Sequence, residues 1–155
     1  MKTILPLLTL LLALGCGHDH HDHDHHHHGA GHGHAAPHGG VLVNVQNEFC
    51  HLEFVREPDS QRLQLHVMRF HPKEGPLNIA MPQIEVSAVT ATATNAIVFQ
   101  PTEQDGVTAT TNATSLYVAE VDWLKDDTTF DGTVKELKVE DKTITKITFK
   151  FGKTK

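Results

Sequence analysis

From residue 39 onward, apolar side chains recur at every second position in short runs that turn-forming residues separate. In the clearest run, Ile147, Phe149 and Phe151 alternate with lysine and threonine. Because successive side chains of a strand point to opposite faces, a period of two is typical of a strand with one buried face. The pattern therefore predicts an all-β domain over residues 39–152.

The expected strands are joined by turns rich in Pro, Gly, Asn and Asp, including turns at 58–61, near Asn95 and at 140–142. Their ranges are 41–45, 49–56, 62–70, 77–81, 84–93, 96–100, 107–110, 116–121, 134–139 and 144–151. In the last of them, Ile144 falls on the polar face. One helical turn is expected at 122–127, where Asp122 caps and Trp123 and Leu124 pack inward. Such short antiparallel strands favour a single Ig-like β-sandwich, and an open barrel is the alternative.

The first 15 residues indicate a secretion signal. Lys2 is positively charged, and residues 4–14 are almost wholly apolar. This stretch is shorter than the roughly 20 residues that a helix needs to cross a membrane, but it fits the core of a signal peptide. The following Ala13-Leu14-Gly15-Cys16 resembles the lipobox of bacterial lipoproteins, which implies that Cys16 is lipidated and becomes the mature N-terminus. An ordinary cleaved signal with an incidental cysteine is the alternative.

The lipobox resemblance implies a lipid anchor on the periplasmic side of a bacterial membrane. Gly17 follows the cysteine, where an Asp would favour the inner membrane, so we expect the outer membrane. The chain has 13 Lys and Arg against 19 Asp and Glu. This acidic balance argues against binding of nucleic acid, which calls for a basic face.

Residues 16–38 form a low-complexity segment of His, Asp, Gly and Ala, which we call the tether. Without apolar periodicity it cannot bury a core, so we expect it to be disordered. Its histidines are His18, His20, His21, His23, His25, His26, His27, His28, His32, His34 and His38. Neutral imidazole binds zinc, nickel and copper(II), so this composition predicts binding of about two or three such ions. A His-rich spacer with no metal role is the alternative.

Cys16 and Cys50 are the two cysteines of the chain. With Cys16 committed to lipid, Cys50 has no disulfide partner. Because Cys50 lies in an apolar strand, we expect a small buried hydrophobe, and a metal thiolate is the alternative.

Three segments carry a second resemblance. Pro-His-Gly-Gly-Val-Leu-Val at 37–43 is followed by Phe-Cys-His-Leu-Glu-Phe-Val at 49–55 and Leu-Gln-Leu-His-Val-Met at 63–68. The order resembles small His-rich bacterial envelope lipoproteins and the N-terminal domain of some periplasmic adaptors of heavy-metal efflux pumps. Relatives often carry an Asp after the third strand, where this chain has Arg69-Phe70-His71. The resemblance implies a periplasmic β-sandwich associated with metal handling, with a metal transporter or an efflux adaptor as partner.

A second candidate metal site lies on the expected sheet. In the strands at 49–56 and 62–70, four side chains share the face opposite the apolar one, and a hairpin turn at 58–61 pairs them. These residues are His51, opposite Met68, and Glu53, opposite His66. Opposed Cβ atoms are about 4.5–5.5 Å apart, close enough for the side chains to chelate one ion.

His38 and His71 are expected near the same strand ends. The alternative is a solvated outer face on which the His and Glu side chains only hydrogen-bond across the ladder.

The leading functional hypothesis is a lipid-anchored periplasmic protein that binds zinc, nickel or copper for buffering or for delivery to a transporter. The alternative is a protein-interaction module of the envelope or of an efflux system, with the tether as a spacer. An enzyme is not expected, because the sequence contains no GxSxG, phosphate-binding Gly-rich loop or HExxH motif.

Cys16→Ser removes the lipid acceptor. We expect this variant to carry no lipid and either to leave the membrane or to remain uncleaved. Intact-mass spectrometry of the membrane and soluble fractions checks this. Recovery of an equally lipidated variant contradicts the assignment.

Overall fold

The computed structural model describes residues 33–102 and 113–152, so the strand expected at 107–110 lies outside the described residues. The strands are β1 (Val41–Val45), β2 (Cys50–Arg56), β3 (Arg62–Arg69), β4 (Gly75–Pro76), β5 (Ile84–Val89), β6 (Thr94–Pro101), β7 (Leu116–Glu120), β8 (Phe130–Val139) and β9 (Lys142–Phe151). Every pairing is antiparallel, which confirms the predicted all-β class. Within the described residues there is no helix, and so no helix long enough to span a membrane.

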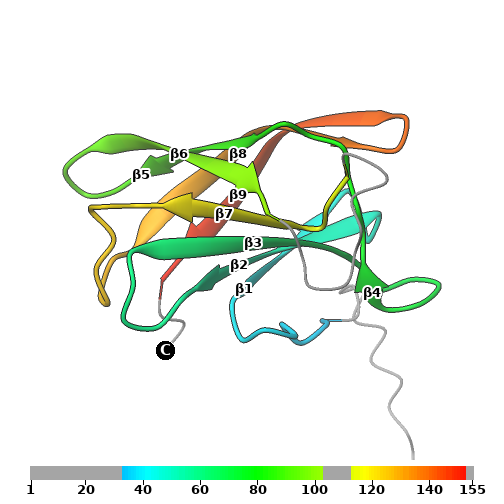
Figure 1. Ribbon diagram of the computed structural model, residues 1–155, viewed down its shortest axis with the longest axis horizontal. Coiled ribbons are helices and arrows are strands. Elements are labelled where there is room, and N and C mark those ends of the chain that lie inside the picture. Colours follow the sequence, from blue (N-terminus) through cyan, green and yellow to red (C-terminus); the bar gives the residue numbers. More distant parts are fainter. Residues whose placement is uncertain (1–32, 103–112, 153–155) are drawn as a thin grey trace, which may run out of the picture.

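The strands form one continuous hydrogen-bonded path, β1-β2-β3-β7-β6-β5-β8-β9, with β4 added beside β3. β6 joins the two halves, because most of its length pairs with β5 while its end pairs with β7. Figure 1 shows the path curling back on itself, and its two ends, β1 and β9, lie close together without a ladder between them. The sheet therefore lies between the sandwich and the open barrel, the two architectures that the strand pattern allows.

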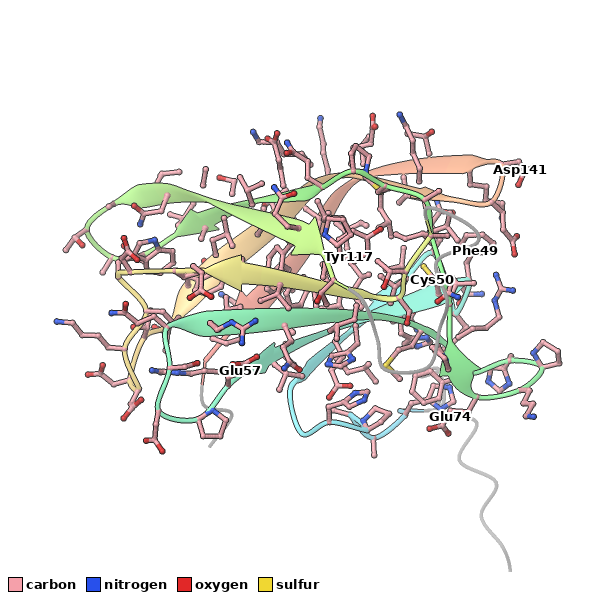
Figure 2. The ribbon with its side chains drawn as sticks, viewed as in Figure 1. Phe49, Cys50, Glu57, Glu74, Tyr117 and Asp141 are labelled. Carbon is pink, nitrogen blue, oxygen red and sulfur yellow. The ribbon has the colours of Figure 1, made fainter. Side chains whose placement is uncertain are left out.

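The core fills the space between the two halves of the curled sheet. Phe54 of β2 stacks on Phe149 of β9 with ring centroids 4.0 Å apart, and it meets Phe99 of β6 edge-on at 5.9 Å. Tyr117 of β7 lies in the middle of the molecule in Figure 2. Its hydroxyl lies 3.0 Å from the carbonyl oxygen of Ile79 and accepts a hydrogen bond from the backbone N–H of Met81. Aromatic packing and a satisfied buried hydroxyl together fix the spacing of the halves.

Two expected elements differ in position. The strand expected at 77–81 is a two-residue β4 at Gly75–Pro76 followed by an isolated bridge between Ile79 and Thr114. The turn expected near Asn95 lies at 90–93 instead, where the side chain of Thr90 bonds to the backbone of Ala93. Threonine can close a turn in this way because its hydroxyl replaces a backbone partner.

Ile144 is buried, not on the polar face as its spacing predicts. Two consecutive residues, Thr145 and Lys146, point outward in β9, and the facing residues of β8 change face at the same level. Lys146 has a φ of 58°, which is a left-handed backbone conformation. This local change of phase brings Ile144 back to the core, where it is 5% exposed.

The expected helical turn at 122–127 is absent from the structure, and two reverse turns take its place. The backbone N–H of Lys125 donates to the hydroxyl of Thr128, so a side chain takes the bond that a helix would use. Trp123 and Leu124 pack against the core as expected.

Cys50 is fully buried on the core side of β2, which confirms the prediction of a small hydrophobe. Burial raises the pKa of its thiol to about 11. In a Cys16→Ser chain, we therefore expect Cys50 to resist a thiol reagent at pH 7–8 and to react fully after unfolding. Reagent kinetics with and without denaturant check this, and rapid labelling of the native protein contradicts the burial.

Candidate metal centre

Residues 33–40 lie across the outer face of β2 and β3, and we call this segment the strap. In Figure 1 it runs below these strands before it enters β1. His34 stacks on Phe70, and His38 stacks on His66 with ring centroids 3.8 Å apart. Residues 33–38 belong to the predicted tether, so the folded unit begins earlier than residue 39.

The predicted hairpin register is confirmed, with His51 opposite Met68 and Glu53 opposite His66. The alternative of a solvated outer face is wrong, because all four side chains are buried, His51 to 2% and Glu53 to 0% exposure. The strap and the residues next to it cover these four side chains. Of His51, Glu53 and His66, only His51 belongs to the group of possible metal ligands found among the described residues.

Glu53 holds the strap on the sheet. Its Oε1 accepts hydrogen bonds from the backbone N–H groups of His38 and Gly40, both at 2.9 Å. Its Oε2 lies 2.7 Å from Nδ1 of His38. Burial alone would raise the pKa of Glu53, but these hydrogen bonds outweigh it and hold the pKa below its usual range. The Glu53 carboxylate is therefore ionised and occupied by the strap.

A glycine is required at position 40 because the strap approaches β2 closely there. A Cβ on Gly40 would lie 2.3 Å from the carbonyl oxygen of Phe54.

The other two predicted ligands, His66 and Met68, line a cavity of about 280 Å³ together with His38 of the strap. The Nε2 atom of His66 also bonds to Gln64.

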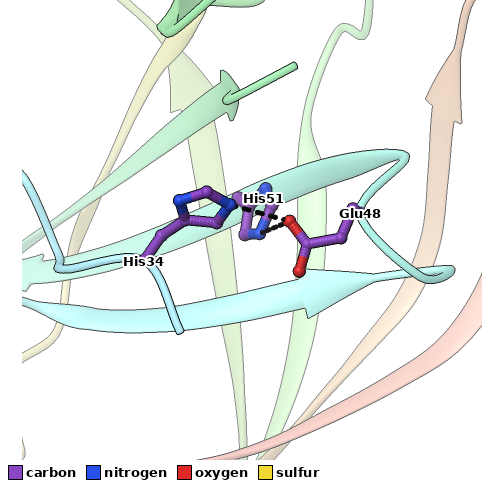
Figure 3. Close-up of side chains that lie close together, drawn as sticks. All are labelled: His34, Glu48 and His51. Carbon is purple, nitrogen blue, oxygen red and sulfur yellow. Dashed lines mark hydrogen bonds and ion pairs between the residues drawn. The ribbon is translucent and has the colours of Figure 1, made fainter. Parts of the chain in front are cut away.

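His51 belongs to a different cluster, made with His34 of the strap and Glu48 of the β1–β2 turn (Figure 3). One ligand atom from each of the three residues lies within 4.8 Å of the others. The Oε2 atom of Glu48 lies 2.9 Å from Nε2 of His34 and 3.3 Å from Nε2 of His51. Two imidazoles thus face one carboxylate oxygen.

Glu48 is positioned by an unusual turn. Gln46, Asn47 and Glu48 all have positive φ angles, of 48°, 53° and 72°. The backbone N–H of Glu48 donates to Oδ1 of Asn44 at 2.8 Å, and the amide nitrogen of Asn44 donates to Oε1 of Glu48. One carboxylate oxygen is therefore held while the other faces the imidazoles, as in the outer-shell support of metal ligands.

Phe70 forms an aromatic wall beside the cluster. His34 stacks on its ring at 4.0 Å, and His51 meets the ring edge-on at 4.6 Å. Burial lowers the pKa of His51, although the Glu48 carboxylate opposes this. The neutral imidazole that results is the form that coordinates metals. Within the described residues, Nδ1 of His51 is buried without a hydrogen-bond partner.

Two imidazole nitrogens and one carboxylate oxygen form a donor set that suits zinc, nickel or copper(II). No thiolate takes part, because Cys50 points to the opposite face of β2. The His34–Glu48–His51 group could thus hold one such ion.

Sequence reasoning missed Glu48 because it lies in a turn, where acidic residues are usually solvated. Its one sequence signal is that it precedes His51 by three residues. Cys16 and the tether histidines from His18 to His32 lie outside the described residues, so their assigned roles stay predictions.

Comparison with known proteins gave no match to a protein-family model and no significant match to a curated protein or a solved structure.

Replacing Glu53 with Ala removes the acceptor that anchors the strap. We expect a loss of about 2–4 kcal/mol in the free energy of unfolding at pH 7, measured by urea denaturation. Because the pKa of Glu53 is lowered in the folded state, its stabilisation is complete above about pH 4.3 and declines as pH falls further through the folded pKa.

The matched control is Asp131→Ala, which breaks an exposed pair with Lys150 and should change stability by no more than about 0.5 kcal/mol. Equal effects of the two variants would contradict an anchoring role for Glu53.

Proposed function

We propose that this protein is a lipid-anchored periplasmic protein that binds one divalent transition-metal ion at the His34–Glu48–His51 cluster, for buffering or for delivery to a transporter. The observation that carries the proposal is that two imidazole Nε2 atoms, from the strap and from β2, converge on one oxygen of Glu48.

The cluster has features that a purely structural contact does not need. Neutral His51 leaves Nδ1 buried without a partner among the described residues, an arrangement that costs about 1–3 kcal/mol. Glu48 lies at the end of a three-residue left-handed run, which is also energetically unfavourable. Unpaired buried polar atoms and unfavourable backbone conformations in proteins are often found at sites of binding or catalysis.

The tether supports the same proposal from the sequence side. His32 is separated from His34 by one glycine, so the His-rich segment runs directly into the strap. We expect tether histidines to bind ions weakly and with fast exchange, because a disordered chelator loses chain entropy on closing. An ion held loosely there is at high local concentration beside the preorganised cluster.

The test uses a Cys16→Ser chain with asparagine in place of the nine histidines from His18 to His32, which leaves the cluster intact. Competition with a chromophoric chelator should show one zinc ion per chain. Glu48→Gln and His51→Ala should each weaken binding by at least about tenfold, because each removes a ligand or its charge. Affinity should fall in acid as the pH drops through the lowered pKa of His51, since protonated imidazole cannot coordinate.

Asp131→Ala is the control, because Asp131 pairs with Lys150 between β8 and β9, outside both the cluster and the strap. Its zinc affinity should match that of the parent chain. Unchanged binding in both Glu48→Gln and His51→Ala would show that the cluster is not the site.

A further inference from the structure

The His34–Glu48–His51 cluster supplies three ligands, one fewer than a tetrahedral ion requires. We propose, on the basis of the proposed function, that His71 supplies the fourth, so that the ion has a closed coordination shell of three histidines and one glutamate. His71 lies in the segment between β3 and β4. No water or substrate position then remains open, which suits storage and transfer of the ion and not hydrolytic chemistry.

The rings of the three histidines lie side by side. His34 is the central one, with ring centroids 5.3 Å from His51 and 5.2 Å from His71. His71 is also close enough to His51 to interact with it electrostatically. Phe70, which immediately precedes His71, stacks on His34 and so keeps this end of β3 beside the cluster.

His71 is free to turn toward an ion. The other four histidines of the described residues each have a polar partner for a ring nitrogen: Glu48 for His34 and His51, Glu53 for His38, and Gln64 for His66. His71 is exposed, and its side chain makes no hydrogen bond or ion pair within the described ranges. Rotation of an exposed side chain is fast and disturbs no core packing.

The four ligands come from four separate segments: the strap, the β1–β2 turn, β2 and the segment after β3. Figure 3 shows that His34 and Glu48 approach His51 from different parts of the chain. An ion bound by all four would hold the strap down at a second point, beyond the Glu53 anchor. Because His71 is the exposed member, it is the ligand that exchanges first and marks the side on which the ion enters and leaves.

Cobalt(II) is the probe, because its visible absorption is strong in four-coordinate sites and weak when water raises the coordination number. In the chain with asparagine at the nine tether positions, cobalt should give the strong four-coordinate spectrum. His71→Ala should weaken that absorption and lower zinc affinity about tenfold or more. Lys73→Ala, an exposed change in the same segment, should leave both unchanged.

His71→Cys provides a positive signal that does not depend on a loss. A thiolate at position 71 should add a sulfur-to-cobalt charge-transfer band in the near ultraviolet, and circular dichroism should confirm an unchanged fold.

If His51→Ala abolishes binding while neither change at position 71 alters the spectrum, water fills the fourth position. The inference about His71 is then wrong, and the three-residue site stands. If His51→Ala also leaves binding unchanged, the proposed function itself is wrong.

Discussion

The arrangement of the outer face depends on one buried carboxylate. Glu53 lies at the centre of the β2–β3 ladder on the side away from the core, where an ionised group without partners would be strongly unfavourable. The strap satisfies it with two backbone N–H groups and an imidazole. In return, the carboxylate holds a segment that has no ladder of its own. His34 precedes His38, the first residue that Glu53 holds, by four residues, so its place beside His51 follows from where Glu53 holds the chain.

This dependence separates two roles that look alike in the sequence. His51 and Glu53 form a His-x-Glu pair on one strand face, and both residue types bind metals. In the structure, Glu53 accepts hydrogen bonds from the backbone of the strap, whereas Glu48 in the neighbouring turn faces the imidazoles. The difference is one of available lone pairs. Each oxygen of Glu53 already accepts from the strap, while Oε2 of Glu48 is directed toward ring nitrogens only. The carboxylate that anchors the strap and the carboxylate of the candidate metal cluster are therefore two separate groups on one surface.

Local patterns anticipated those features that depend on neighbours in sequence. The alternation of apolar residues and the turn at 58–61 set the register of β2 and β3, since a slip of one residue would turn every apolar side chain outward. The burial of Cys50 followed from the same alternation. The pattern failed where backbone geometry broke the period, as at Lys146, whose positive φ returns Ile144 to the core. It also failed at Thr90, whose side chain closes a turn at 90–93, ahead of the expected position near Asn95 in the sequence.

The sequence by itself determined the all-β class, the pairing of His51 with Met68 and of Glu53 with His66, and the supply of imidazoles next to the domain. These are consequences of a two-residue period and of composition, and both can be read from the sequence without knowing which distant segments come into contact. Only the tertiary structure decided which candidate ligands meet. The cluster joins His34 to Glu48 and His51 across 14 and 17 positions, through a strap whose composition carries no strand or helix signal. That contact exists because a buried charge had to be satisfied from outside the sheet, a requirement that arises only once the sheet has formed.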